Sequence, residues 1–284
     1  KGTTHEFWKT VEAGALQAGS ETGVKVIWKG PLEEDDRQSQ IKLVQQFITE
    51  EVDGIVLAPL DDTALVDSVK TATGRKIPVV IFDSPLKAEA GKDFVSLVAT
   101  DNRKGGQIGA IELSRLMKAE GKKKYVMLRY QENSASTDQR EAGFMDVMSD
   151  GFAAVSNNQY GGATMGSAME KSMAMIDDIK AADGIFTPNE STTRGMLEAL
   201  RKNNLAGKKL FVGFDTSPDL IAALRAGEIH ALVAQNPRKM GYEAVKAMVA
   251  HLKGESVPAK IDTGVMLITK QNLDSPEVKQ LLGN

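Results

Sequence analysis

Short apolar runs alternate with amphipathic segments along almost the whole chain. The apolar runs are rich in β-branched and aromatic residues, which is typical of buried parallel strands. The predicted strands span residues 24–28, 54–58, 79–82, 95–99, 125–128, 153–155, 185–187, 210–214 and 231–234. Between them apolar residues recur at helical spacing, as at Ile41, Val44, Phe47 and Ile48. The alternation predicts an α/β fold in which helices cover both faces of parallel sheets.

Two segments occur twice, in the same order and at nearly equal separations. The segment that begins at Asp53, Asp-Gly-Ile-Val-Leu-Ala-Pro, returns at Asp183 as Asp-Gly-Ile-Phe-Thr-Pro. Residues 76–85, Lys-Ile-Pro-Val-Val-Ile-Phe-Asp-Ser-Pro, return at 209–218 as Lys-Leu-Phe-Val-Gly-Phe-Asp-Thr-Ser-Pro. A strand followed by a turn and a helix can produce one such echo by chance. Two echoes in order predict two similar doubly wound parallel-sheet lobes.

The second echo ends on Asp83 in the first copy and Asp215 in the second. Open parallel sheets bind ligands beyond the carboxyl ends of their strands, so we expect these aspartates on opposite walls of a ligand cleft between the lobes. Each carboxylate can accept charge-assisted hydrogen bonds from hydroxyl groups. Helix capping is the alternative role for either residue alone, since aspartate is a favoured N-cap.

Further polar and aromatic side chains are expected near the same strand ends. Phe7 and Trp8 are adjacent on the first predicted helix, so both cannot point into one core, and an outward ring could stack on a sugar face. One ring in the core and the other capping the surface is the alternative. Asn189 and Gln235 follow strands and could bind a ligand or satisfy loop backbone. Spacing alone favours a solvated ion pair for Arg140.

Composition narrows the function. The 284 residues include 42% apolar and 26% charged residues, with a net charge of -3 and no basic stripe, so nucleic acid is not an expected partner. Cysteine is absent, which excludes thiol catalysis and disulfides. There is no metal-ligand spacing, phosphate loop or nucleophile elbow, and the segment Gly105-Gly106-x-x-Gly109, which opens a predicted helix, indicates close packing. We expect no cofactor, no metal and no catalytic residues, although a glycosidase using the two aspartates is an alternative.

Six motifs together resemble ribose-type periplasmic binding proteins, the sugar receptors of ABC importers. They begin at His5 (His-Glu-Phe-Trp-x5-Gly-Ala), Ile77 (Ile-Pro-Val-Val-Ile-Phe-Asp), Thr100 (Thr-Asp-Asn), Arg140 (Arg-x-x-Gly-Phe), Val212 (Val-Gly-Phe-Asp) and Ala234 (Ala-Gln). The resemblance covers essentially the whole chain. It implies Phe7 and Trp8 as stacking aromatics, Tyr160 as an aromatic of the second lobe, and a hydrogen-bonding set of Asp83, Arg140, Asn189, Asp215 and Gln235. For Arg140 it replaces the solvated ion pair with a sugar contact.

Departures from that family bear on the ligand. His5 stands where ribose receptors carry asparagine, and Ser84 stands where they carry arginine, so the ligand is expected to be another pentose, a hexose or a polyol. The run Gln131-Glu132-Asn133 replaces a glycine-containing loop, which adds Glu132 to the candidate contacts.

The resemblance also implies an organisation and partners. Three hinge crossings are expected near Asn102, Gln235 and Gly264. The N-terminal lobe then comprises residues 1–102 and 237–264, and the C-terminal lobe residues 103–236 and 265–284. The expected protein is an exported, periplasmic monomer that closes around a sugar or polyol and is read by a membrane ABC importer permease, with a chemotaxis receptor as a further candidate reader.

Two expectations concern the beginning of the chain. The first predicted helix follows Lys1 almost directly, so a first strand is expected upstream of that residue. The effector-binding domain of a lactose-repressor-type regulator shares the implied fold and is the alternative function. A basic helical module upstream would indicate that regulator, whereas an apolar leader would indicate export.

Overall fold

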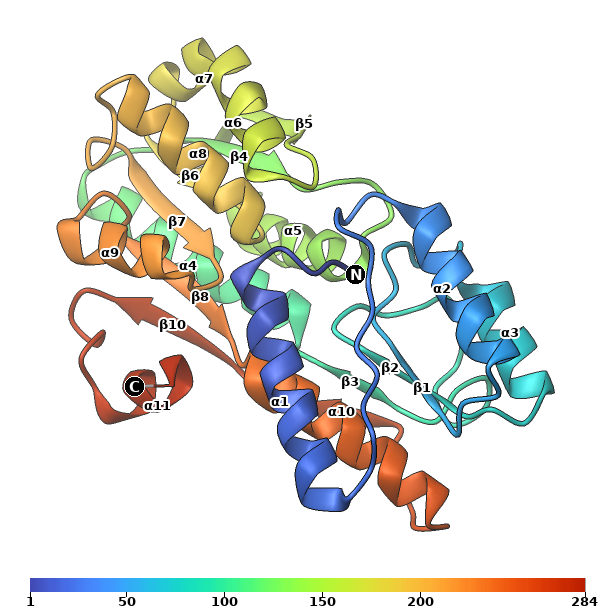
Figure 1. The fold of residues 1–284 in the computed structure, drawn as a ribbon. Coiled ribbons are helices and arrows are strands. Elements are labelled where there is room, and N and C mark those ends of the chain that lie inside the picture. Colours follow the sequence, from blue (N-terminus) through green and yellow to red (C-terminus); the bar gives the residue numbers. More distant parts are fainter. Residues whose placement is uncertain (284) are drawn as a thin grey trace. The chain divides into compact units, whose positions relative to one another are not determined.

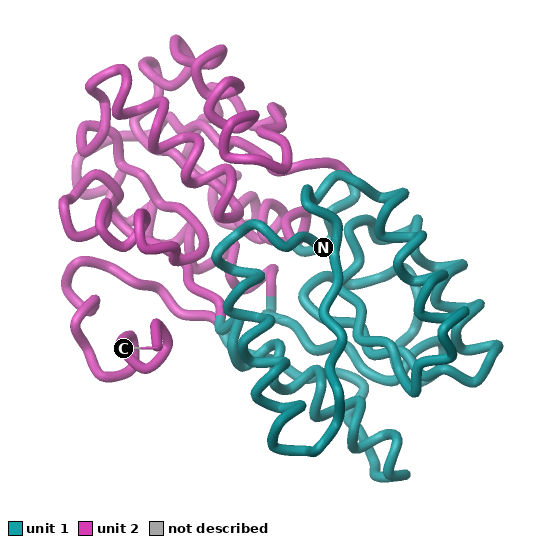
Figure 2. Tube along the Cα trace, in the orientation of Figure 1, with its two compact units in different colours: residues 1–101, 133–136, 236–264 teal, residues 102–132, 137–235, 265–284 magenta. Residues whose placement is uncertain are grey.

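The protein is described here by a computed structural model of residues 1–283, which separates into two compact units (Figure 2). Unit 1 contains residues 1–101, 133–136 and 236–264. Unit 2 contains residues 102–132 and 137–235, and continues from residue 265 to the end of the described chain. The chain therefore passes between the units after residues 101, 235 and 264, and the short segment 133–136 joins unit 1.

Unit 1 is built on a four-stranded parallel sheet in the order β1-β2-β3-β9, of which β1, β2 and β3 are labelled in Figure 1. Its strands are β1 (Ile55–Leu57), β2 (Val79–Phe82), β3 (Leu97–Ala99) and β9 (Lys260–Asp262), and its helices are α1 (Glu6–Thr22), α2 (Arg37–Thr49), α3 (Val66–Gly74) and α10 (Pro237–Leu252). Alternate residues of β2 enter different cores, as the strand period of two requires. Val79 and Ile81 pack with α2 and α3, whereas Val80 and Phe82 pack with α1 and α10.

Unit 2 contains a six-stranded sheet in the order β10-β8-β7-β6-β4-β5, which is parallel except for the antiparallel edge strand β10. The strands are β4 (Lys124–Arg129), β5 (Ala153–Tyr160), β6 (Gly184–Phe186), β7 (Leu210–Phe214), β8 (Ala231–Gln235) and β10 (Val265–Thr269). The helices are α4 (Asn102–Ala119), α5 (Ala135–Met148), α6 (Met165–Ala174), α7 (Ile176–Ala181), α8 (Glu190–Lys202), α9 (Pro218–Ala226) and α11 (Pro276–Leu282). The first two residues of α5 belong to unit 1.

The unit 2 sheet is also covered on both faces. Phe186, Val212 and Val233 pack with apolar residues of α4 and α5, whereas Ile185 and Phe211 pack with those of α6, α8 and α9. Helices on both faces of each parallel sheet confirm the predicted α/β fold. Because β6, β7 and β8 are neighbouring parallel strands, their carboxyl ends lie together at one edge of the sheet.

Three predicted or omitted strands differ from the structure. The predicted strand at residues 24–28 is wrong: the segment forms no ladder, and its apolar side chains Val26 and Trp28 instead pack against helices α1 and α10. Strands β9 and β10 were not predicted. Lys260-Ile-Asp is too short and polar to stand out, and β10 begins directly after the expected crossing at Gly264.

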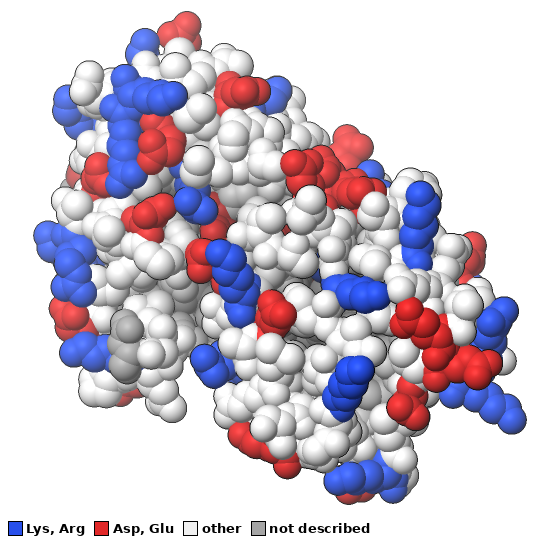
Figure 3. Space-filling view, viewed as in Figure 1, with Lys and Arg blue, Asp and Glu red and all other residues white. Residues whose placement is uncertain are grey.

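Two further features are the distribution of charged side chains on the surface and the apolar character of the helices. On the face shown in Figure 3, basic and acidic side chains are interspersed rather than gathered into a stripe. Within residues 1–283, no helix combines the length and the apolar character that crossing a bilayer requires.

Candidate ligand-binding site

Two aspartates adopt the same uncommon backbone conformation. Asp83 has a φ of 62° and Asp215 a φ of 71°, and each directly follows the last residue of a central strand. Their backbone N–H groups donate to Val98 O at 3.0 Å and Val233 O at 2.9 Å, respectively. Left-handed conformations are rare outside glycine and concentrate at functional sites. The echo in the sequence therefore corresponds to a matched local structure in the two units.

In unit 1, Asp83 is 3% exposed and faces a buried lysine. The Lys1 ammonium Nζ lies 3.0 Å from Asp83 Oδ2 and donates to Ser136 Oγ at 3.0 Å. Ser84, which is also buried, accepts a hydrogen bond from the Ser136 N–H at 3.1 Å. The predicted residues Asp83 and Ser84 thus share a cluster with Lys1 and Ser136. Sequence reasoning missed Lys1 because no recognisable motif includes it.

A second buried carboxylate lies beside α1 in unit 1. Glu34 Oε1 accepts from the Trp8 indole Nε1 at 2.6 Å and from His5 Nδ1 at 2.8 Å. Burial opposes ionisation of Glu34, but the hydrogen bonds from His5 and Trp8 and the charges of His5 and Lys1 outweigh it, so the pKa of Glu34 lies well below its usual range. Gly2 permits this packing, because a Cβ there would lie 2.9 Å from Glu34 Cγ. The predicted contact His5 is therefore held in place by a residue that the sequence did not single out.

Phe7 and Trp8 differ in burial. Trp8 is 2% exposed and meets Phe82 edge to face at a centroid distance of 6.2 Å, within the core shared by α1, α10 and the sheet. Phe7 is partly exposed and lies perpendicular to Trp8 at 4.9 Å. One ring thus belongs to the core, and its indole N–H is directed at Glu34.

In unit 2, Asp215 is 6% exposed and fully engaged. Oδ2 accepts from the Glu190 backbone N–H at 2.8 Å, and Oδ1 accepts from Gln235 Nε2 at 2.7 Å. Burial raises the pKa of Asp215 to about 6, although the positive charge of Arg140 and these hydrogen bonds limit the rise. Ionisation of the Asp215 carboxyl therefore lowers the stability of the ligand-free protein.

Arg140 is 2% exposed, so it is not a solvated surface arginine. Its Nε donates to Asn102 Oδ1 at 2.8 Å, its Nη1 donates to Pro188 O at 2.9 Å, and its guanidinium lies 4.1 Å from the centroid of the Phe214 ring. Asn102 Nδ2 is buried without a hydrogen-bond partner among the described residues. Such an orphaned donor beside the arginine is a further polar group that a ligand could satisfy.

Close packing of α4 on α5 fixes Arg140. A Cβ added at Gly106 would lie 1.9 Å from Arg140 O, and one at Gly143 would lie 2.0 Å from Arg103 O. Only glycine allows the two helix backbones to approach this closely. A Cβ at Gly105 would lie 3.0 Å from Phe214 Cζ and one at Gly109 would lie 2.8 Å from Phe186 Cε2, so the predicted close packing of this glycine segment is confirmed.

Asn189 begins α8 as its N-cap. Its Oδ1 accepts from Thr192 N at 3.3 Å and from Thr192 Oγ1 at 2.7 Å, and its Nδ2 donates to Ser191 Oγ at 3.2 Å. Thr193 Oγ1 accepts from Phe214 N at 3.0 Å and so ties α8 to β7. Asn189 is thereby placed one residue from the Glu190 N–H that binds Asp215, and its own polar groups serve the cap.

Tyr160 and Glu132 lie near a different ion pair of unit 2. The Arg129 guanidinium is 4.5 Å from the centroid of the Tyr160 ring, and Arg129 Nε donates to Glu141 Oε2 at 2.5 Å. Burial raises the pKa of Glu141 to about 7, against the lowering effect of Arg129. Glu132 is exposed and contributes a negative charge near Tyr160.

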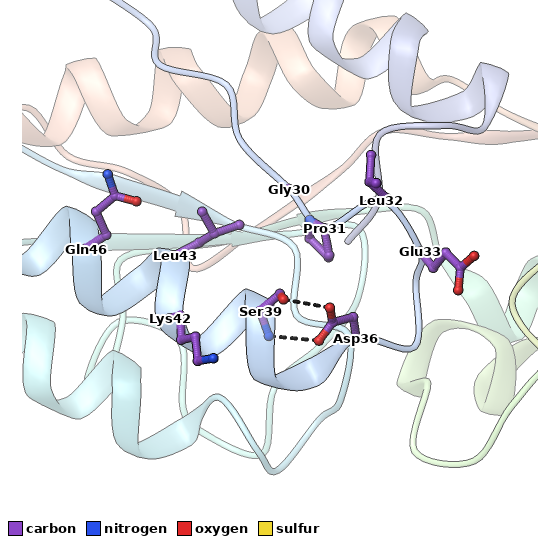
Figure 4. A pocket seen from close by; sticks show the side chains of 9 residues that line it. All are labelled: Gly30, Pro31, Leu32, Glu33, Asp36, Ser39, Lys42, Leu43 and Gln46. Carbon is purple, nitrogen blue, oxygen red and sulfur yellow. Dashed lines mark hydrogen bonds between the residues drawn. The ribbon is translucent and has the colours of Figure 1, made fainter.

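A surface pocket of unit 1 lies apart from these candidates. It has a volume of about 600 Å³ and is formed by residues 30–33 and by residues 36, 39, 42, 43 and 46 at and along α2 (Figure 4). Asp36 in this pocket caps α2 by accepting from Ser39 N at 2.9 Å. None of the candidate ligand-binding residues lines it.

Other chemistry finds little support in the described part of the chain. Residues 1–283 contain no group of three or more His, Asp or Glu side chains that could hold a metal ion. His230 is partly buried, its Nδ1 accepts from Phe211 N at 3.2 Å, and burial lowers its pKa. This histidine supports the start of β8 and stands away from the aspartates.

The chain belongs to the periplasmic binding protein domain family, whose model matches residues 1–256. This membership confirms the expected family and agrees with the expected location outside the cytoplasm.

Particular relatives are similar over nearly the full length. A solute-binding protein of Agrobacterium vitis with bound D-fucose is 33% identical, with a TM-score of 0.93 and coverage of 98% of this chain and 96% of that one. A carbohydrate transporter solute-binding protein of Agrobacterium radiobacter in complex with D-arabinose is 31% identical, with a TM-score of 0.93 and coverage of 99% and 95%. The D-ribose/D-allose-binding protein of Pseudomonas aeruginosa is 28% identical over 95% of this chain and 86% of its own length. All three relatives are binding proteins, which is the class that was predicted for this chain.

Proposed function

We propose that this protein binds one neutral monosaccharide or related polyol reversibly and delivers it unchanged to an ABC importer. The observation that carries the proposal is the matched pair Asp83 and Asp215, each buried and left-handed at the carboxyl end of a central strand. Sugar hydroxyl groups donate to such carboxylates, and the charge-assisted bonds offset the cost of burial. The relatives that carry D-fucose and D-arabinose support the ligand class.

The candidate side chains divide into proposed contacts and proposed supports. As contacts we assign His5, Phe7, Asp83, Arg140, Asp215 and Gln235. Trp8 and Ser84 support them, because the Trp8 indole is held by Glu34 and Ser84 accepts from Ser136. Asn189 supports Asp215 through the cap of α8. Tyr160 and Glu132 are candidate contacts at the edge of unit 2.

The two clusters act together in this proposal. Ligand binding brings the Asp83 cluster of unit 1 and the Asp215 cluster of unit 2 onto one sugar, by hinge closure at the crossings near Asn102, Gln235 and Gly264. A sugar that contacts both clusters has higher affinity for the closed form and so shifts the population toward it. We infer that the monomeric closed form is what the importer permease, and a chemotaxis receptor where one exists, recognises.

A thermal-shift screen against pentoses, hexoses and polyols tests the proposal. A ligand at 100 times its dissociation constant stabilises the folded protein by about 2.7 kcal/mol, which is easily measured. We expect one sugar or a small stereochemical group to raise the melting temperature. The shift should disappear in Asp215→Ala and persist in the matched control His230→Ala. A screen without any hit contradicts the proposal.

Recovery of the ligand separates binding from catalysis. After prolonged incubation with the sugar that gave the shift, mass spectrometry and NMR should return the same sugar in full. Conversion or hydrolysis that stops in Asp83→Asn and Asp215→Asn would instead indicate a glycosidase that uses the two carboxylates.

A further inference from the structure

The Lys1 side chain is buried in a way that ordinary lysines are not. Its side chain is 4% exposed, whereas that of Lys9, on the surface of α1, is 57% exposed. Removing an ammonium group from water is costly unless charged or polar partners replace the lost hydration. Here the partners are the Asp83 carboxylate and the Ser136 hydroxyl, each 3.0 Å from Nζ. The chain therefore holds a charged group beside a proposed sugar-binding aspartate.

Both members of this ion pair retain hydrogen-bonding capacity. An ammonium group has three N–H donors, and the described residues offer Lys1 only the two partners Asp83 and Ser136. Asp83 Oδ2 is fully buried, and although Lys1 lies within ion-pair distance, no hydrogen bond of favourable geometry reaches this oxygen. Buried polar atoms in this condition call for a partner. A donor and an acceptor that are adjacent match two neighbouring hydroxyl groups, one accepting and the other donating.

The surroundings of the pair are fixed before any ligand arrives. Asp83 is held at φ 62° by its N–H bond to Val98 O, and Ser136 is held by its N–H bond to Ser84 Oγ. Gly2, next to Lys1, is packed against Glu34 so closely that a Cβ would lie 2.9 Å from Glu34 Cγ. The fixed positions of Asp83 and Ser136 around the ammonium, and of Gly2 next to the Lys1 backbone, limit the positions that the ammonium can take. This favours selective recognition.

We propose that Lys1 is a specificity-determining residue, donating from Nζ to one sugar hydroxyl oxygen while the neighbouring hydroxyl group donates to Asp83 Oδ2. The inference rests on the proposed sugar-binding function. Because the ammonium and the carboxylate neutralise each other, the pair matches a neutral sugar with two adjacent hydroxyl groups rather than a sugar acid. A sugar that lacks either hydroxyl leaves a buried donor or acceptor unpaired and is rejected.

Titration calorimetry with Lys1→Met, wild-type protein and the control Lys9→Met tests this role, using the best sugar of the screen and its monodeoxy analogues. Lys1→Met should bind the parent sugar at least tenfold more weakly, and Lys9→Met should bind it as wild type does. Wild type should also discriminate strongly against one deoxy analogue, and Lys1→Met should lose that discrimination. Circular dichroism establishes that each variant is folded.

The outcomes separate the role of Lys1 from the function itself. A folded Lys1→Met variant with wild-type affinity, or one that weakens every analogue by the same factor, overturns the role and leaves sugar binding intact. If Lys1→Met does not fold, Lys1→Arg decides, because it keeps the charge beside Asp83 but places its donors in a planar fork. An unchanged affinity and deoxy profile in Lys1→Arg overturns the role, and an altered profile supports it. Wild type that binds no sugar rejects both proposals.

Discussion

Replacing Asp215 with asparagine should stabilise the ligand-free protein at neutral pH and weaken sugar binding. Burial raises the pKa of Asp215 from 3.8 to about 6, so the folded protein prefers the uncharged form. One pKa unit corresponds to about 1.4 kcal/mol, and the shift therefore destabilises the folded state by up to about 3 kcal/mol once the carboxyl is ionised. Asparagine removes that charge. Its Oδ1 can still accept from the Glu190 N–H, and its amide can donate to Gln235 if the Gln235 amide turns over.

The raised pKa of Asp215 in the folded protein determines how the stability difference changes with pH. Because the folded pKa is the higher one, the unfolded chain loses this proton first as the pH rises from about 4, and stability falls until the folded protein is also ionised above about 6. The free energy of unfolding of Asp215→Asn should therefore exceed that of wild type by about 1 to 3 kcal/mol at pH 8 and equal it near pH 4. Urea unfolding of ligand-free protein at both pH values measures the difference.

The same variant should bind its sugar about 10- to 100-fold more weakly at pH 8, because a charge-assisted hydrogen bond is lost. Asp177→Asn is the control, since that side chain is 96% exposed, and it should change stability by no more than about 0.5 kcal/mol. The reasoning is refuted if Asp215→Asn is less stable than wild type at pH 8, or if its advantage is equally large at pH 4.

Three further changes test the supporting structure. Glu34→Gln should lower the free energy of unfolding by about 2 to 4 kcal/mol at pH 7 in urea titrations, because a buried charged acceptor is lost, and since the folded pKa is lowered this difference should shrink below about pH 4.5. Gly106→Ala should destabilise by about 3 kcal/mol or more and weaken sugar binding through Arg140, whereas Gly74→Ala, with open space around it, should be neutral or stabilising by up to about 1 kcal/mol in thermal unfolding. Wild-type stability should lose up to about 3 kcal/mol between about pH 4.5 and 7 through Glu141, and a pH series of Glu141→Gln that keeps this slope would contradict the raised pKa.

The parts predictable from sequence are those encoded by local repetition. The echo around Asp83 and Asp215 identified two strand ends because the same apolar run, aspartate and turn proline recur in order. The structure adds that both residues are left-handed, which the residue type permits but does not require. Strand 24–28 could not be judged in the same way, because an apolar run becomes a strand only when a neighbour pairs with it.

The residues that sequence reasoning missed depend on distant contacts. Glu34 belongs to the run Pro-Leu-Glu-Glu-Asp-Asp, which is typical of a solvated acidic loop, and only its packing against His5 and Trp8 makes it a buried acceptor. Lys1 is likewise defined by Ser136, far along the chain. Adjacency in the sequence indicates that Phe7 and Trp8 do not share one core, but it does not say which ring is buried; in the structure it is Trp8, packed edge to face on Phe82.

The clusters around Asp83 and Asp215 share a physical signature that argues for binding over stability. Each aspartate has an uncommon backbone conformation, and each carries its charge away from water. In unit 2 that arrangement raises the pKa of Asp215, and in unit 1 it leaves Asp83 Oδ2 beside an ammonium but without a well-formed hydrogen bond. Replacing buried charged groups by hydrophobic residues of similar volume often leaves the stability of a protein unchanged or raises it. The stability of the fold therefore does not explain why two matched aspartates are buried. A ligand hydroxyl that donates to Asp83 Oδ2 supplies the hydrogen bond that this oxygen lacks, and one that donates to Asp215 adds a charge-assisted bond to the two that its oxygens already accept.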